Sequence, residues 1–334
     1  MKWNSLRQGI SIETEPMPTP SLEFSIVSGA NEDLIVECLR SLYNSLKSTA
    51  YVWKVTATCN NAGTVLPRRL REEFPGIDVI QNNSPRGFAS NHNVVLRRSS
   101  ADYVWILNDD LIFSGDAVAA VTEFMEAPEN ARVAVVSPRL NNTDGSLQPS
   151  TYSFSSMPQT LLSHSGIREH RVTESIVAAL APVLRPRAGT SRYWKHDRTM
   201  EVETFRGACV AVRMEAAREV GPMAEVALVG GEEVEWHYRL RRAGWKIVFF
   251  ADTSVVHYGS QTVDHATQQH LPEYLKGTLY YFRSAKPRVT YRIFCGVLLG
   301  LFGARLGASR IRGDKNGVNV ARRYLRVAWD ALRG

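Results

Sequence analysis

This chain of 334 residues has no long apolar run. Its first twenty residues hold no apolar stretch of the kind found in a secretory signal peptide. An apolar stretch near the C-terminus, 293–304, has only 12 residues, which is too short to cross a bilayer comfortably. These absences predict a globular protein with neither a signal peptide nor a membrane-spanning helix.

Cysteine is also scarce. Four cysteines lie far apart in the chain, at Cys38, Cys59, Cys209 and Cys295. No CxxC pair indicates a zinc site, and no dense framework indicates a disulfide-stapled secreted fold. We therefore expect reduced thiols in a cytoplasmic protein.

Positive charge is concentrated at the C-terminal end. Between Arg283 and the last residue, twelve Lys or Arg face two Asp, a local charge of +10 in a chain whose net charge is +7. The remainder of the chain therefore has a charge of −3. A basic tail on an acidic body predicts an anionic partner surface. We expect a membrane and no nucleic acid, because the tail has few aromatics and the sequence shows no RNP-like or helix-turn-helix pattern.

Strand-like and helix-like segments alternate in the first half. Strand patterns cover 22–28, 51–57, 77–80, 102–107 and 132–137, and helix patterns cover 34–46, 88–99 and 115–126. A second block has strand patterns at 204–213 and 245–250 and a helix pattern at 231–244. Between 138 and 200 the periodicity fades. The alternation predicts an α/β fold with a mainly parallel sheet and helices on both faces, which binds ligands beyond the carboxyl ends of its strands.

The C-terminal segment 318–332 is amphipathic. One helix face has Val318, Ala321, Leu325, Trp329 and Leu332, with Arg322 and Arg326 beside it. Two interpretations stay open: an interfacial helix on a membrane, or a helix packed on the body with a solvated basic face.

Two polar stretches follow predicted strands. "LNDD" (107–110) supplies hard oxygen ligands of the kind that Mg²⁺ or Mn²⁺ needs beside a diphosphate, although Asn and Asp are also ordinary turn formers. In "NNSPRGFASNHN" (82–93), Gly87 lets the backbone approach a ligand at the start of a helix, and the alternative is a plain loop.

Two later stretches complete the candidate chemistry. In "GGEEVEWHYRLRRAGW" (230–245), Glu235 and Arg239 are spaced as a structural i,i+4 pair, whereas Glu232 and Glu233 follow a Gly-Gly loop where a carboxylate can serve as general base. His257 in "VVHYGSQT" (255–262) follows an apolar strand, as a structural histidine or as a ligand to metal or diphosphate.

The order of these stretches is more specific than any one of them. Along the chain stand "TCNNAGT" (58–64), "RGFASNHN" (86–93), "LNDD", "SPRLNNTDGSLQPS" (137–150), "RGACVAVR" (206–213), "GEEVEW" and "HYGSQT". Over 22–262 this order resembles the inverting family 2 glycosyltransferases, in particular the rhamnosyltransferase-like branch. The resemblance implies a GT-A-like, mainly parallel sheet flanked by helices, here with a C-terminal helical basic extension.

The resemblance also implies roles for particular residues. Glu233 matches the catalytic base, where the family has Asp. Asp110 matches the metal-binding Asp, with Mg²⁺ or Mn²⁺ as the cofactor, and His257 matches a position that approaches the metal or diphosphate. The donor-binding positions are Asn60, Gly87, Asn91, Asn108 and Asp109, with Asn60 standing where the family often has a nucleobase-contacting Asp.

Four segments are expected: a flexible arm (1–21), a nucleotide-sugar-binding half (22–137), an acceptor-binding half (138–265) and a basic amphipathic helical tail (266–334). The implied function is metal-assisted transfer of a sugar with inversion from a nucleotide-sugar, with dTDP-rhamnose as the first choice, to a glycan or lipid-linked acceptor. The expected location is the cytoplasm, peripherally on the inner face of the membrane. The alternative is a catalytically inactive nucleotide-binding scaffold of the same fold.

Overall fold

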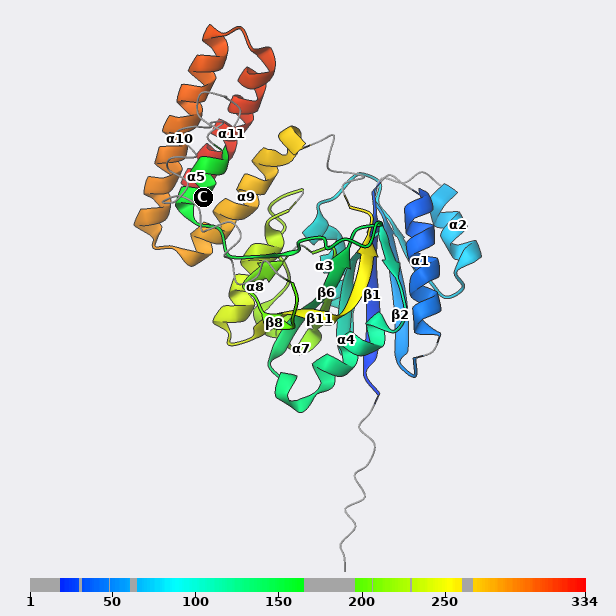
Figure 1. Ribbon diagram of the computed structural model, residues 1–334. Helices are drawn as coiled ribbons and strands as arrows, with labels where there is room; N and C mark the ends of the chain where they lie inside the picture. The colour runs from blue at the N-terminus through cyan, green and yellow to red at the C-terminus, as the bar shows by residue number, and fades with distance from the viewer. Residues whose placement is uncertain are drawn as a thin grey trace, which may run out of the picture.

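A nine-stranded mixed sheet forms the centre of the protein body (Figure 1). The computed structural model describes residues 19–29, 32–47, 49–60, 65–164, 196–205, 207–228, 230–259 and 267–334. The sheet contains β1 (Ser21–Ser28), β2 (Val52–Cys59), β3 (Asp78–Gln81), β4 (Tyr103–Asn108), β5 (Leu111–Phe113), β6 (Val133–Asn141), β8 (Met200–Glu201), β10 (Cys209–Arg213) and β11 (Lys246–His257). A second, two-stranded sheet pairs β7 (Thr151–Tyr152) with β9 (Thr204–Phe205).

The strand directions bring the polar strand ends to one edge. The order is β3-β2-β1-β4-β10-β6-β11-β5, with β8 beside β11. β1 to β4 are parallel, β10 is antiparallel to both β4 and β6, and β11 is parallel to β6. β6 and β11 therefore run in the same direction as β1 to β4, and the carboxyl ends of all six meet at one edge. This confirms the predicted α/β fold with a mainly parallel sheet.

Helices cover both faces of the sheet, as predicted (Figure 1). One core lies under α1 (Glu32–Leu46), α2 (Val65–Glu73) and α4 (Ala117–Glu126), and the other under α3 (Phe88–Arg98), α7 (Met214–Val220) and α8 (Glu232–Arg242). In β4, Trp105 faces the first core and Ile106 the second. A strand buried on both faces reads as an unbroken apolar run, which is why "YVWIL" was recognisable.

Two predicted strands have different bounds in the structure. The predicted strand 204–213 divides into β9 and β10, because a turn at Gly207 and Ala208 separates them and sends them to different sheets. The predicted strand 245–250 continues to His257 through a register shift between Phe250 and Ser254. His257 is thus the last residue of β11 and pairs with Leu111 of β5.

The C-terminal helices form a third core beside the body. It joins α9 (Thr267–Ala285), α10 (Arg288–Ile311) and α11 (Lys315–Arg333) to α5 (Met157–His164) and to the outer side of α8. The apolar face of α11, including Ala321, Tyr324 and Val327, is buried in this core. For 318–332, the structure therefore supports packing on the protein rather than an interfacial helix. Of the predicted N-terminal arm, residues 1–18 lie outside the described part, and β1 begins at Ser21.

The apolar stretch near the C-terminus belongs to a longer helix than its apolar residues alone indicate. The stretch 293–304 lies inside α10, a helix of 24 residues whose length and composition alone are sufficient to cross a membrane. The length of an uninterrupted apolar run underestimates the length of this helix, because Arg288, Arg292 and Arg305 limit the run without ending the helix.

Candidate active site

The turn after β4 contacts the end of β11. The Asp110 Oδ1 atom lies 3.1 Å from the His257 Nε2 atom. The Asn108 amide is 3.4 Å from the same Nε2 atom. The backbone N–H of Tyr258 donates to the Asp110 carbonyl at 2.9 Å, which fixes the turn against the strand end. The structure thus brings three predicted site residues together at the carboxyl edge of the sheet.

Gln148 holds the other ring nitrogen of His257. Its amide nitrogen donates to Asn142 Oδ1 at 2.9 Å and approaches the His257 carbonyl at 3.4 Å, so its oxygen faces the imidazole. His257 Nδ1 therefore donates to Gln148 Oε1 at 2.5 Å, which fixes the orientation of the ring and leaves its Nε2 atom on the side of Asp110 and Asn108. Sequence reasoning missed Gln148, although it lies in the quoted stretch 137–150.

This arrangement fits a divalent cation. Asp110 Oδ1 is buried and has no hydrogen bond of standard geometry, although the His257 Nε2 atom lies beside it. A buried carboxylate oxygen and a ring nitrogen that lie together without a hydrogen bond are a pair of the kind that ligates a cation, and the bond from His257 Nδ1 to Gln148 is the usual outer support of a ligating histidine. Among the described residues no group of three His, Cys, Asp or Glu gathers at one point. Protein ligands this few require substrate phosphates and water to complete the coordination shell, as is common for Mg²⁺.

Asp109 faces the end of β1 rather than His257. Its Oδ2 atom lies 3.4 Å from the backbone nitrogen of Gly29. Burial raises the pKa of Asp109 to about 6, and the hydrogen bond from Ser28 only partly opposes this. The Asp110 charge raises it further. The two carboxylates of "LNDD" therefore serve different neighbours.

Three asparagines connect the ends of β2 and β3 to α3. Asn60 Nδ2 donates to the Arg86 carbonyl at 3.0 Å, and Asn60 Oδ1 accepts from the Arg86 backbone N–H at 2.8 Å. Asn82 donates to both Asn60 Oδ1 and Asn91 Oδ1, at 2.9 and 2.7 Å. Asn60 thus holds the 82–87 loop through a donor and an acceptor, which an Asp in its place cannot do.

Gly87 lies against another segment of the protein. A Cβ atom at Gly87 would come within 2.5 Å of the Ala227 carbonyl oxygen. The next residue, Phe88, donates its backbone N–H to the Leu228 carbonyl at 3.3 Å. The start of α3 and the segment 221–228, which leads to α8, are therefore in direct backbone contact.

The two glutamates at the start of α8 have different surroundings. Glu232 is 1% exposed, and its carboxyl oxygens have no hydrogen bond of standard geometry within the described part of the chain. Burial, followed by the charge of Glu233, raises the pKa of Glu232 to about 8. Glu233 is only half-buried, and its Oε2 atom accepts the Gly231 backbone N–H at 2.9 Å. Glu233 is therefore the more accessible carboxylate.

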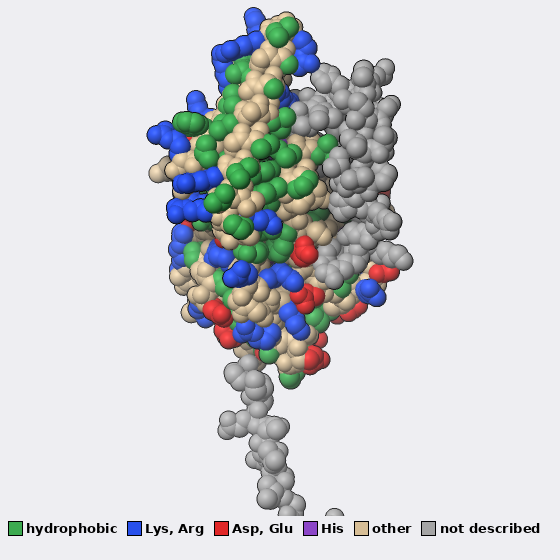
Figure 2. Space-filling view, turned by 90° about the vertical axis from the view of Figure 1, so that its left-hand side faces the viewer, with side chains coloured by type: hydrophobic (Ala, Val, Ile, Leu, Met, Phe, Trp, Pro, Cys, Tyr) green, Lys and Arg blue, Asp and Glu red, His purple; other side chains and the backbone are tan. Residues whose placement is uncertain are grey.

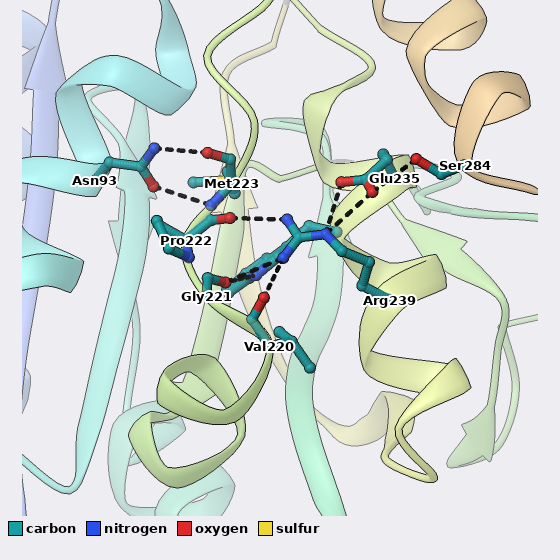
Figure 3. A network of polar contacts seen from close by, with 9 residues as sticks. Asn93, Val220, Gly221, Pro222, Met223, Glu235, Arg239 and Ser284 are labelled. Carbon is teal, nitrogen blue, oxygen red and sulfur yellow. Dashed lines mark hydrogen bonds and ion pairs between the residues drawn. The ribbon is translucent and has the colours of Figure 1, made fainter.

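Arg239 does more than pair with Glu235 (Figure 3). It donates to both oxygens of Glu235 and to the carbonyls of Val220, Gly221 and Pro222. On the far side of the segment, Asn93 of α3 pairs with the backbone of Met223 in both directions. Figure 3 shows these contacts fastening 220–223 between α3 and α8. The predicted i,i+4 pair is present, but its link to this segment was not predictable from local spacing.

Sequence comparison identifies related proteins. The model of a family described as "Glycosyltransferase like family 2" matches residues 20–275. The N-acetylglucosaminyl-diphospho-decaprenol L-rhamnosyltransferase of Mycobacterium tuberculosis is 23% identical over 230 residues, which cover 64% of this chain and 69% of that protein.

Structural comparison identifies the fold. The mannosyltransferase PcManGT from Pyrobaculum calidifontis, in complex with GDP-Man and Mn²⁺, has a TM-score of 0.52 at 15% identity. The superposition covers 96% of this chain and 88% of the PcManGT chain. GalNAc-T7 with UDP, GalNAc and Mn²⁺ has a TM-score of 0.54 at 13% identity. That superposition covers 79% of this chain but only 48% of the GalNAc-T7 chain. Both are GT-A glycosyltransferases, so the expected GT-A fold is confirmed.

Proposed function

Because this chain belongs to the glycosyltransferase-like family 2, we propose that it transfers a sugar, with inversion, from a nucleotide-sugar to a glycan or lipid-linked acceptor. The observation that supports this most directly is the convergence of Asp110 and His257 at the carboxyl edge of the sheet, where the buried Asp110 Oδ1 atom lies 3.1 Å from the His257 Nε2 atom. Ligands of parallel α/β sheets bind at this edge.

The first half of the chain, 22–137, binds the donor in this proposal. Asn60, Asn91 and the loop that they hold, up to Gly87, border the nucleotide, and Asn108 and Asp109 lie nearer the diphosphate. dTDP-rhamnose is the first donor to test, because the Mycobacterium tuberculosis relative is named as an L-rhamnosyltransferase. UDP-sugars follow.

Asp110 and His257 would hold Mg²⁺ or Mn²⁺, which when bound stabilises negative charge on the departing diphosphate. The protein supplies the remaining chemistry. Glu233 accepts the proton of the acceptor hydroxyl while the new oxygen–carbon bond forms and the bond from the anomeric carbon to the diphosphate breaks. The Gly231 N–H bond to Glu233 orients the carboxylate. Glu232, with a pKa of about 8, stays mostly protonated at neutral pH and is less suited to act as a base.

The second half, 138–265, would bind the acceptor. A lipid-linked acceptor fits the name of the Mycobacterium tuberculosis relative, which contains diphospho-decaprenol. Such an acceptor would place the enzyme in the cytoplasm, at the inner face of the membrane.

The first experiment measures thermal stability of the wild type and of Asp110→Asn with each nucleoside diphosphate, with and without Mn²⁺. We expect one nucleotide to stabilise the wild type in a Mn²⁺-dependent manner and to lose that effect in the variant. Equal stabilisation of both proteins would remove Asp110 from the metal site. No stabilisation by any nucleotide would count against the transferase function.

A transfer assay then tests the base. Glu233→Gln should abolish transfer and leave nucleotide binding intact, whereas Glu232→Gln, the matched control one residue away, should retain transfer. Full activity in Glu233→Gln refutes the assignment. A wild type that binds nucleotide yet transfers no sugar to any acceptor would instead indicate the inactive scaffold.

A further inference from the structure

The outer face of α10 is apolar along the whole helix. Val289, Ile293 and Val297 follow one another at one-turn spacing, and they are 71%, 63% and 49% exposed. The same face continues through Gly296, Gly300, Gly303, Ala304, Gly307 and Ile311. At 1.5 Å per residue, this 24-residue helix presents an uncharged stripe about 36 Å long. A helix face exposed to water ordinarily has polar or charged residues there.

The opposite face of α10 is buried in the third core, but that packing does not account for the apolar outer face. Phe294, Leu298 and Phe302 are buried in the third core, and Phe302 stacks on Tyr324 of α11 with ring centroids 4.6 Å apart. By contrast, a Cβ atom on any of the four glycines of the outer face would meet no atom within 4 Å. Nothing in the described part of the chain needs those positions to be glycine, and glycine weakens a helix in water relative to alanine.

Basic side chains flank the stripe at both ends and along one margin. Arg288 and Arg292 lie at its first end, and Arg310, Arg312 and Lys315 lie around the turn that joins α10 to α11. The exposed face of α11 adds Arg322, Arg323 and Arg326. Figure 2 shows the green stripe with blue side chains along one margin and at the tip. The residues 288–334 include two acidic side chains, Asp314 and Asp330, and Asp314 caps α11 by accepting the Gly317 N–H.

We propose that the outer face of α10 docks on an anionic lipid bilayer. The valines and isoleucines enter the region beneath the headgroups, and the arginines of α11 and of the hairpin tip contact the headgroup phosphates. An apolar stripe flanked by positive charge is complementary to such a surface. This face lies beyond the family match, which ends at residue 275, and binding to it does not depend on the proposed transfer reaction.

The helix lies on the membrane rather than crossing it. Its inner face is committed to the third core, so the lipid-facing stripe is only one face wide. α11 packs along α10, and a spanning α10 would take Arg322, Arg323 and Arg326 into the hydrocarbon region at high cost. Membrane docking is therefore assigned to α10, and α11 supplies the positive charge.

The test is co-sedimentation of the full chain with vesicles of phosphatidylcholine, with and without phosphatidylglycerol, in the absence of nucleotide and metal. The wild type should bind the anionic vesicles and release as salt rises. Ile293→Glu with Val297→Glu should weaken binding about a hundredfold. The matched control is Val65→Glu on α2, which is also exposed and lies outside the stripe, and it should bind like the wild type.

Neutralising Arg322, Arg323 and Arg326 to Gln should remove the preference for anionic vesicles, again about a hundredfold. Unchanged thermal unfolding of the variants shows that they are folded. Equal vesicle binding by the wild type and the Ile293/Val297 variant overturns the proposal. So does a wild type that ignores vesicles and self-associates through this stripe in sedimentation velocity. Loss of transferase activity alone has no bearing on either result.

Discussion

Removing the Arg239 side chain should lower the free energy of unfolding strongly, because Arg239 holds a buried carboxylate and three backbone carbonyls. Its partner Glu235 is 3% exposed and has, apart from Arg239, the hydroxyl of Ser284 at 3.1 Å as a donor. Arg239→Met leaves that carboxylate buried without its cation, which typically costs about 3–5 kcal/mol. The carbonyls of Val220 and Pro222 also lose a charged donor. We expect a loss of about 4 kcal/mol in the free energy of unfolding.

Two further variants separate the charge from the shape of Arg239. Arg239→Lys keeps a cation for Glu235 but cannot reach two carboxylate oxygens and the carbonyls of 220–222 together, so about half of the loss should remain. Adding Glu235→Gln to Arg239→Met removes the stranded charge, so the double variant should be more stable than the sum of the single effects by at least about 1 kcal/mol.

Urea denaturation of the wild type, the three single variants and the double variant measures these differences. Transfer kinetics give a second readout, because 220–231 leads directly to Glu233, and we expect Arg239→Lys to lower kcat more than it raises KM. A loss below about 1 kcal/mol for Arg239→Met, or strictly additive effects in the double variant, would refute the view that Arg239 fastens this segment.

Four other substitutions test separate parts of the protein. Burial raises the pKa of Glu232 to about 8 from the ordinary 4.5, so between these values the folded protein binds more protons than the unfolded chain and stability should fall as pH rises. Glu232→Gln should flatten that fall when urea midpoints at about pH 5 and about pH 8 are compared, and an unchanged slope contradicts the assignment. Gly277→Ala should lower the free energy of unfolding by about 1–3 kcal/mol, because its Cβ atom would lie 2.8 Å from the Gly230 carbonyl oxygen. Gly300→Ala, on the open face of α10, should instead stabilise the protein by up to about 1 kcal/mol. Equal effects of the two substitutions in urea denaturation would refute this. Asn60→Asp removes the donor to the Arg86 carbonyl and should lower the free energy of unfolding by about 1 kcal/mol in urea, and a stabilised variant would contradict this.

The elements that were predictable from the sequence are those whose own residues dictate them. β4 is buried on both faces, so its apolar run was plain, and the polar residues after it marked the strand end. α3 and α8 begin within three residues of their predicted starts. The stretch 204–213 was predicted as one strand because Cys209 continues the apolar pattern of Phe205. The chain turns between these residues, and only the pairing of β9 with β7 and of β10 with β4 shows that they belong to two strands.

The candidate site likewise contains residues that a local pattern indicates and residues that depend on contacts between distant segments. The proximity of Asn108, Asp110 and His257 was predictable because motif order places each at a strand end, and the sheet brings strand ends together. Gln148 was not found, because its role depends on the fold placing residues 109 positions apart in contact. The role of Gly87 against Ala227 likewise follows from a contact between distant segments, which no local pattern encodes.

The motif residues and the residues that orient them are therefore different sets. Asp110, His257 and Glu233 would do the chemistry, but Gln148 orients His257, and Arg239 with Asn93 holds the segment before Glu233. Because that segment also contacts Gly87, a change on one side of it should reach both the 82–87 loop and Glu233. Variants of Gln148 should alter metal dependence, whereas variants of Arg239 should alter kcat at saturating metal. Intact motifs in a relative are thus insufficient evidence of an active site unless these supporting contacts are also present.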